Sequence, residues 1–253
     1  MPICHNQGAA IHYEVHGSGK PVVLIHGVAV NFATNYAAFG WTELLTENGF
    51  QVIGLDLRGH GASDKPQSSA DYSSAILASD VLAVLDELSI EQAAVVGYSL
   101  GSAITLYLAQ HFPERVSKAI LIATGDGLIG LGDHSIASTG ADLKEAVSRD
   151  EYPKDLPAHV ATYWNFVEHS GGCRKAVAAL MDGEFEPATA QQASQIHVPT
   201  VVISGALDLV LGQGSELAAS LGNCRYIEIA EADHFNLALL DEVKSEVTHS
   251  LTN

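Results

Sequence analysis

The chain contains few cationic side chains. It has 12 lysines and arginines against 30 aspartates and glutamates, which gives a formal net charge of −18 at pH 7. Nucleic acids and anionic membrane surfaces are bound by clusters of basic residues. The composition therefore argues against nucleic acid and membrane surfaces as partners.

Cysteine is also scarce, with only Cys4, Cys173 and Cys224. An odd number of cysteines without a Cys-x-x-Cys spacing predicts neither a disulfide framework nor a zinc site. The 12 histidines are scattered, and the close pair His12 and His16 shares one face of a predicted strand, which favours exposed strand residues over metal ligands. We expect reduced thiols, no metal and no cofactor.

Long apolar runs are missing as well. No stretch approaches the roughly 18 apolar residues that a membrane-spanning helix needs. The first ten residues, MPICHNQGAA, lack the basic segment and the apolar segment of a secretory signal. A soluble protein in the cytoplasm is the expectation.

What the chain does contain is a regular alternation of strand and helix patterns. Hydrophobic residues make up 47% of the sequence, and several short runs are almost continuously apolar, as in strands buried on both faces of a parallel sheet. The predicted strands are residues 10–15, 22–27, 51–57, 93–99, 118–123, 200–205 and 225–230. The predicted helices are residues 41–49, 72–89, the run after Ser99, 215–222 and 237–251. This order predicts an α/β protein with a doubly wound, mostly parallel sheet.

One long interruption breaks the alternation. About 75 residues separate the strand near 123 from the strand at 200, whereas α/β loops usually have about 2–6 residues. Short helices are predicted here at 139–150, 156–170 and 172–183. We expect a core domain of residues 1–124 and 198–253 with a helical cap of residues 125–197.

Aromatic side chains are the candidates for lining a substrate pocket. Tyr163, Trp164 and Phe166 lie in the predicted cap, and Tyr98 lies at the end of a predicted core strand. For the cap residues, the alternative is that each ring packs the cap onto the core domain.

The sequence VVGYSLGS at 95–102 predicts a strand that turns abruptly into a helix. Gly97 and Gly101 flank Ser99 at a spacing that leaves room for neighbouring backbone in a cramped bend. Such a bend exposes the Ser99 hydroxyl beside the unpaired N–H groups of the helix start, where negative charge is stabilised. Ser99 is therefore the candidate nucleophile; the alternative is a serine in a tight turn without a catalytic role.

A base and an acid follow later strands. In α/β sheets, functional groups gather at the carboxyl ends of the strands. His234 follows the strand at 225–230 and is the candidate base for Ser99, with an exposed loop histidine as the alternative. Asp208 follows the strand at 200–205 and is the candidate for orienting His234.

Three other residues compete for these roles. Asp126 also ends a strand and is a second candidate for orienting the base. Asp233 adjoins His234, and adjacent side chains rarely face each other. His60 lies between two glycines in the segment DLRGHGASDKP, a pattern that favours a structural loop role.

Taken together, the motifs of the chain resemble those of the α/β-hydrolase family. The segments LIHG, DLRGHGASDKP, GYSLG, SGALD and ADHF occur in the order and spacing of that family, although Asp233 stands where the family commonly has glycine. The resemblance implies an acyl-enzyme mechanism at Ser99, and it implies backbone N–H groups of Val28 and Leu100 as the donors of an oxyanion hole. It also implies that the insertion is a lid.

The expected function is a cofactor-free serine hydrolase that acts on a small-molecule carboxylic ester. Lactonases, including those that cleave acyl-homoserine lactones, share these motifs, as do carbon–carbon bond hydrolases and perhydrolases or non-haem haloperoxidases. A different class is a small-molecule receptor on the same fold, which would turn its ligand over slowly or once. The oligomeric state is left open.

Overall fold

An eight-stranded sheet forms the centre of the computed structural model, which describes residues 2–131, 135–185 and 187–253. The strand order is β1-β2-β4-β3-β5-β6-β7-β8. β2 pairs antiparallel with β1 and β4, and the strands from β4 to β8 are parallel. The bounds are β1 Ile3–Asn6, β2 Ala9–His16, β3 Lys20–Ile25, β4 Phe50–Leu55, β5 Ala93–Tyr98, β6 Val116–Ile122, β7 Thr200–Gly205 and β8 Cys224–Ile229.

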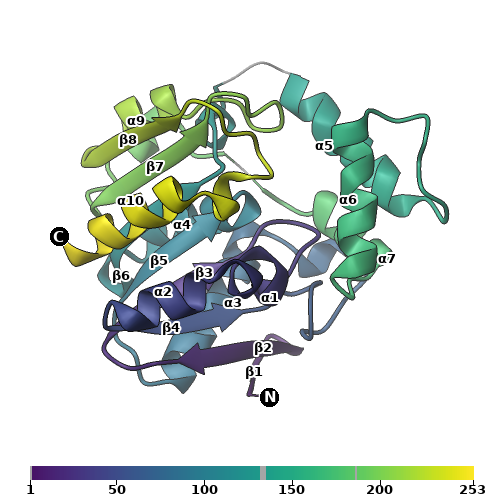
Figure 1. The fold of residues 1–253 in the computed structure, drawn as a ribbon. Coiled ribbons are helices and arrows are strands. Elements are labelled where there is room, and N and C mark those ends of the chain that lie inside the picture. The colour runs from purple at the N-terminus through teal and green to yellow at the C-terminus, as the bar shows by residue number, and fades with distance from the viewer. Residues whose placement is uncertain (1, 132–134, 186) are drawn as a thin grey trace.

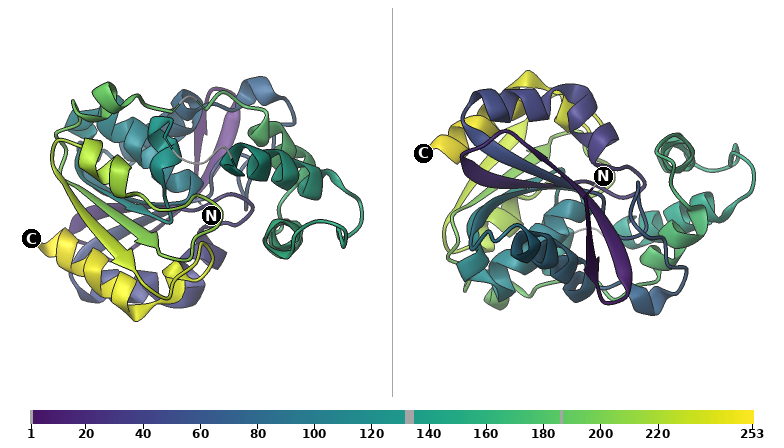
Figure 2. Two further views of the ribbon diagram at one scale, coloured as in Figure 1. Left: turned by 90° about the horizontal axis from the view of Figure 1, so that it is seen from above. Right: turned by 90° about the horizontal axis from the view of Figure 1, so that it is seen from below.

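Helices cover both faces of the sheet, as the views from above and below show (Figure 2). One face packs against α1 Phe32–Asn35, α2 Trp41–Glu47 and α10 Asp241–Thr252. The other packs against α3 Ser74–Glu87, α4 Leu100–His111 and α9 Ser215–Ser220. The side chains of β3, β5 and β6 alternate between the two cores, which is why these strands carry uninterrupted apolar runs. The predicted fold class, α/β with a doubly wound and mostly parallel sheet, is confirmed.

The long connection between β6 and β7 carries its own helices, which lie beside one end of the sheet (Figure 1). They are α5 Ser135–Ser148, α6 Ala158–His169 and α7 Arg174–Met181; the short α8 Ala190–Ala193 belongs to the same connection but contacts α9. Residues 132–134 and 186 of the predicted cap lie outside the described residues. A small apolar cluster joins α5, α6 and α7 to Ala29 of the core, so these helices pack over the carboxyl end of β3.

The insertion returns to the core through backbone hydrogen bonds. The Glu184 N–H donates to the Tyr72 carbonyl at 3.1 Å, and the Ser74 N–H donates to the Glu184 carbonyl at 3.2 Å. The start of α3 therefore anchors the end of α7.

The sequence patterns missed several short elements. β1 is a four-residue edge strand, and α1 and α8 are four-residue helices. Segments this short contain too few residues for a helical or alternating period to be recognised. None of the helices in the described ranges combines the length and apolar character that crossing a bilayer requires.

A buried ion pair connects the loop after β4 with α3. Arg58 donates to both carboxylate oxygens of Asp80, from Nη2 at 2.8 Å and from Nε at 3.0 Å. The Arg58 and Asp80 side chains are 2% and 0% exposed. Removing one partner of such a pair leaves an uncompensated buried charge.

We expect Asp80→Ala to lower the free energy of unfolding by about 3–5 kcal/mol, because Arg58 stays buried without its counter-ion. Urea unfolding monitored by circular dichroism measures this loss. Asp86→Ala is the matched control, since Asp86 pairs with Arg115 but is 67% exposed, and its loss should stay below about 1 kcal/mol. Equal losses for the two variants would contradict the importance of the buried pair.

Candidate active site

Ser99 occupies a strained turn between β5 and α4. Its backbone has φ 53° and ψ −111°, a region that residues with a side chain rarely adopt. The Ser99 N–H donates to the Ile122 carbonyl at 2.9 Å, and the Ser99 carbonyl accepts from the Ser102 N–H at 2.8 Å. These hydrogen bonds to β6 and α4 hold the strained conformation in place.

The two glycines around Ser99 are required by close backbone contacts. A Cβ atom on Gly97 would lie 2.1 Å from the Gly101 carbonyl oxygen, and a Cβ on Gly101 would lie 2.1 Å from the carbonyl oxygen of Ile25. β5, α4 and β3 therefore approach one another more closely than any side chain would allow. The prediction of a cramped strand-to-helix bend is confirmed in its geometry.

Ser99, His234 and Asp208 form a chain of hydrogen bonds. His234 Nε2 lies 2.9 Å from Ser99 Oγ, and His234 Nδ1 lies 2.8 Å from Asp208 Oδ2. All three residues are buried. The structure thus brings together the three side chains that the sequence predicted as nucleophile, base and orienting acid, each at the carboxyl end of a different strand.

Asp208 is held as a carboxylate. Burial pushes the pKa of Asp208 upward, but the hydrogen bond and positive charge of His234 and the N–H groups of Leu211 and Val210 outweigh it, so the pKa lies below its ordinary value. Its second oxygen, Oδ1, accepts from the Val210 N–H at 2.8 Å and from the Leu211 N–H at 2.9 Å. An ionised Asp208 accepts a hydrogen bond from the Nδ1–H of His234, and this arrangement leaves Nε2 to accept the serine proton.

The backbone of His234 is fixed by Tyr98. The Tyr98 hydroxyl donates to the His234 carbonyl at 2.6 Å. Burial raises the pKa of Tyr98 well above its ordinary value, and the negative charge of Asp208 adds to this effect. Tyr98 therefore stays a neutral donor that positions the loop carrying His234.

The loop after β3, which carries Val28, is fixed on both sides of that residue. The Gly27 N–H donates to Asn35 Oδ1 at 2.8 Å, and the Ala29 N–H donates to His60 Nε2 at 3.0 Å. No hydrogen-bond acceptor for the Val28 N–H occurs within the described ranges. The Leu100 N–H is the first of α4, and such N–H groups have no partner within their helix.

Two buried histidines, both in their neutral form, hold this loop in place. His60 Nδ1 lies 3.1 Å from the Arg58 carbonyl, and His26 Nε2 accepts from the Leu57 N–H at 2.9 Å. Burial lowers the pKa of both, and that of His60 falls to about 3. A neutral ring is needed here, because a protonated His60 could not accept the Ala29 hydrogen bond. The prediction of a structural loop role for His60 agrees with these contacts.

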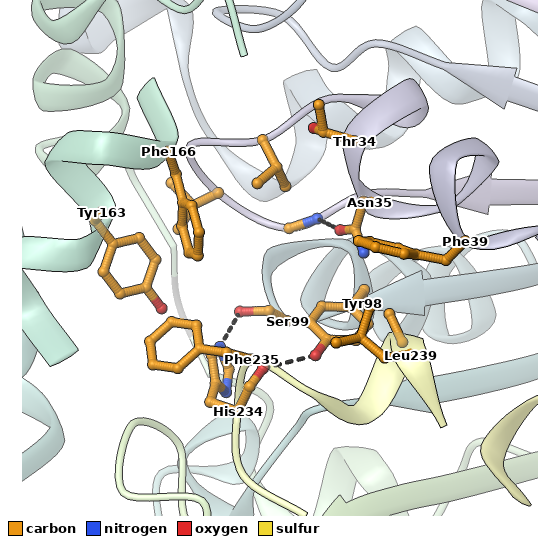
Figure 3. A pocket seen from close by; sticks show the side chains of 14 residues that line it. Thr34, Asn35, Phe39, Tyr98, Ser99, Tyr163, Phe166, His234, Phe235 and Leu239 are labelled. Carbon is orange, nitrogen blue, oxygen red and sulfur yellow. Dashed lines mark hydrogen bonds between the residues drawn. The ribbon is translucent and has the colours of Figure 1, made fainter. Parts of the chain in front are cut away.

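Two apolar cavities meet at Ser99, and Figure 3 shows the side chains that line the first of them. The first, here called the Phe39 cavity, has a volume of about 260 Å³ and includes Phe39, Leu239, Asn35 and Phe166 in its lining. The second, here called the Met181 cavity, has a volume of about 200 Å³ and is lined by residues that include Met181, Leu143, Leu128 and Val210. Val28, Ser99 and Tyr163 line both cavities.

Of the predicted pocket residues, Tyr98, Tyr163 and Phe166 line the Phe39 cavity. Trp164 lines neither cavity, which corrects its predicted placement. Its Nε1 donates to the Arg149 carbonyl at 3.0 Å, and Arg174 lies over its ring at 5.4 Å. Successive residues of a helix point about 100° apart, so Tyr163 and Trp164 of α6 cannot face the same cavity.

The competing acids have other partners. Asp126 Oδ1 accepts from the Leu217 N–H of α9 at 2.8 Å. Asp233 Oδ1 accepts from the N–H groups of Phe235 and Asn236, which closes the turn after His234. His12, expected to be exposed, is buried, and its Nδ1 lies 3.0 Å from Asp56 Oδ2. No cluster of three or more potential metal ligands occurs in the part of the chain that is described.

Sequence reasoning missed Asn35, Phe39 and Leu239. Asn35 orients the loop of Val28, and the other two residues lie at the exposed end of the Phe39 cavity. They belong to α1 and to short 3-10 turns, which give no periodic signal in the sequence.

The neutral His60 makes stability depend on pH. The ordinary histidine pKa of 6.5 applies to the unfolded chain, and the folded value is about 3. Between these values the unfolded state binds more protons, so stability should fall as the pH falls from 6.5, by about 1.4 kcal/mol per pH unit from this residue. Urea unfolding at several pH values measures the slope. His60→Gln, which keeps an acceptor, should show a shallower slope; identical slopes would refute the assignment.

The chain is similar in sequence and in fold to several known proteins. The model of the alpha/beta hydrolase fold family matches residues 20–186. An AB hydrolase superfamily protein of Bacillus subtilis is 38% identical over 248 residues, covering 86% of each chain. The 3-oxoadipate enol-lactonase 2 of Acinetobacter baylyi is 28% identical over 259 residues, covering 93% of this chain and 92% of the relative.

A solved N-acyl homoserine lactone degrading enzyme superposes with a TM-score of 0.75 at 28% identity and covers 99% of both chains. Other matches are partial: the chain aligns with 31% of the length of an uncharacterised Mycobacterium tuberculosis protein, at 38% identity over 113 residues. The family match and the Bacillus subtilis relative extend over most of the chain. The protein therefore belongs to the α/β-hydrolase family.

Proposed function

We propose that the protein is a serine hydrolase that cleaves carboxylic esters through a covalent acyl-enzyme at Ser99. The observation that carries this proposal is the hydrogen-bonded series Asp208, His234, Ser99 at the junction of two apolar cavities. A serine hydroxyl is a weak nucleophile until a neighbouring base accepts its proton. His234 Nε2 is within reach of that proton in the resting structure.

The proposed reaction has two halves. Ser99 Oγ attacks the ester carbonyl carbon while its proton passes to His234 Nε2, and the carbonyl oxygen becomes an oxyanion beside the N–H groups of Val28 and Leu100. Collapse of this intermediate breaks the bond to the alkoxy oxygen, which takes the proton from His234. Water then attacks the acyl-enzyme with His234 as base, and the acid leaves as Ser99 Oγ recovers a proton.

Asp208 supports both halves of this cycle. Its hydrogen bond to Nδ1 keeps His234 in the tautomer that accepts at Nε2, and its charge stabilises the imidazolium that forms. We also propose that residues 125–197 act as the cap of the site, because Tyr163 of α6 lines both cavities at Ser99 and Phe166 of the same helix lines the Phe39 cavity.

A lactone is the second candidate substrate. A lactone is a cyclic ester, so the same steps open its ring and the leaving alkoxide stays attached to the acyl group. Two relatives that align over more than nine-tenths of this chain are described as lactone-cleaving enzymes, which favours this candidate over the carbon–carbon and perhydrolase alternatives.

We expect Ser99→Ala to lower kcat by at least about 10³-fold on p-nitrophenyl esters, since the covalent route is lost, while the circular dichroism spectrum stays unchanged. A fluorophosphonate should inhibit the wild-type enzyme, and mass mapping should find its label on one peptide, the one that contains Ser99. Turnover close to the wild-type rate in Ser99→Ala would remove the nucleophile role.

Asp208→Asn and Asp126→Asn form a matched pair of conservative changes. Asp208→Asn should lower kcat by about 10⁴-fold, because an amide N–H in place of the carboxylate favours the wrong imidazole tautomer. Asp126 caps α9 instead, so Asp126→Asn should change kcat by less than about tenfold. The opposite ranking would transfer the orienting role to Asp126.

A further inference from the structure

Among the residues that the structure describes, no lysine, arginine, aspartate or glutamate lines either cavity at Ser99. The Phe39 cavity is lined by Gly27, Val28, Val30, Thr34, Asn35, Phe39, Tyr98, Ser99, Tyr163, Phe166, His234, Phe235, Ala238 and Leu239. The lining of the Met181 cavity adds Leu100, Ala103, Leu128, Leu143, Met181, Val210 and Leu211. All 12 lysines and arginines of the sequence lie within the described ranges, and none lines either cavity.

Several cations of the cap and of the loop after β4 form contacts away from these walls. Lys144 follows Leu143 in α5, but its Nζ pairs with Asp182 at 2.6 Å on the protein surface. Arg149 pairs with Asp155 at 2.7 Å, and Arg174 lies over Trp164. Arg58 is buried against Asp80. Three cap cations, Lys144, Arg149 and Arg174, are therefore held in contacts away from the cavities, and the other two, Lys154 and Lys175, are exposed.

A carboxylate bound in either cavity would lose its hydration without gaining a cation. Desolvation of an unpaired carboxylate in apolar surroundings is strongly unfavourable. The oxyanion that forms at the scissile carbonyl would add a second negative charge in the same enclosed space, and the protein's net charge of −18 opposes the approach of any anion.

Neutral polar groups meet a different environment. Tyr163 carries its hydroxyl toward the space beside Ser99 (Figure 3), and burial raises the pKa of Tyr163 so that this hydroxyl keeps its proton. Asn35 accepts from Gly27 through Oδ1 and retains its amide N–H groups as donors at the wall of the Phe39 cavity. An amide, ether or ketone oxygen can be satisfied by such donors without a charge.

We propose that the substrate is uncharged on both sides of its scissile carbonyl, with one apolar arm in the Phe39 cavity and the other in the Met181 cavity. This inference rests on the proposed function and specifies its substrate class: neutral esters or lactones are accepted, and those bearing a carboxylate on either arm are rejected. Specificity arises from the absence of a cation in the walls, and not from a clash.

Two matched pairs of esters test the proposal with the wild-type enzyme. p-Nitrophenyl valerate and p-nitrophenyl hemiglutarate have acyl arms of similar length and differ by a terminal carboxylate. p-Nitrophenyl and 3-carboxy-4-nitrophenyl valerate place the carboxylate on the leaving group. After correction for spontaneous hydrolysis, kcat/KM should be at least about 100-fold lower for the charged member of each pair.

Met181→Lys then supplies the missing cation. Lysine has nearly the length and flexibility of methionine, and the matched control Met181→Gln adds polarity of similar length without charge. The discrimination is the ratio of kcat/KM for the neutral ester to kcat/KM for its charged partner. For the pair whose carboxylate reaches the Met181 cavity, this ratio should be about tenfold or more smaller in Met181→Lys than in Met181→Gln. The other pair should keep its ratio, which identifies the arm that each cavity holds.

The outcomes separate this inference from the proposed function. Turnover of p-nitrophenyl valerate that disappears in Ser99→Ala supports the hydrolase, whatever happens with the charged esters. If that turnover is present and the charged esters react within about threefold of their neutral partners, the uncharged substrate class is wrong. If the wild-type enzyme discriminates but Met181→Lys changes neither ratio, the assignment of an arm to the Met181 cavity is overturned.

Discussion

The left-handed backbone of Ser99 is the constraint on which the rest of the site depends. It exists because β5 ends against β3 and α4 starts within van der Waals contact of both, with Gly97 and Gly101 at the contact points. The same geometry turns the Ser99 side chain away from the buried sheet and places the start of α4 beside it. The strain at one residue, on the order of 1–3 kcal/mol, is offset by the burial of β5 and α4 in the two cores.

The loops around this turn are supported by a second set of buried polar contacts. Asn35 and His60 hold the residues on either side of Val28, while Tyr98 and Asp233 shape the turn that carries His234. These groups do not need to touch a substrate to matter. They determine where the Val28 N–H and the His234 imidazole lie relative to Ser99 Oγ, and in the proposed mechanism a displacement of about 1 Å is enough to reduce catalysis severely.

Much of this arrangement could be predicted from the sequence, because it is local. The strand-to-helix turn at Ser99 is encoded by flanking residues, and the positions of Asp208 and His234 follow from the convergence of parallel strands at one edge of the sheet. The orientation of side chains in the insertion could not be predicted in the same way. Tyr163 and Trp164 are adjacent aromatic residues, and the sequence does not distinguish which of them faces Ser99. The packing of α6 on α5 and α7 decides this.

Polar contacts between residues far apart in the chain could not be predicted from the sequence either. Nothing in the residues around Asn35 indicates that its amide orients Gly27, since α1 is a single turn and the contact forms only after β3 and α1 have folded together. His60 could be assigned to a loop from its glycine neighbours, but its bond to the Ala29 N–H depends on the pairing of β3 with β4.

Ser170 connects the insertion to the loop of the core that carries Val28. Ser170, at the end of α6, donates through its hydroxyl to the Ala29 carbonyl at 3.1 Å, and its own carbonyl accepts from Asn31 Nδ2 at 3.0 Å. A movement of α6 away from this loop would break both hydrogen bonds beside the Val28 N–H. Under the proposed mechanism, admission of a substrate by such a movement would be thermodynamically coupled to the positioning of the oxyanion donor, so that the most accessible conformation would be the one least prepared for chemistry.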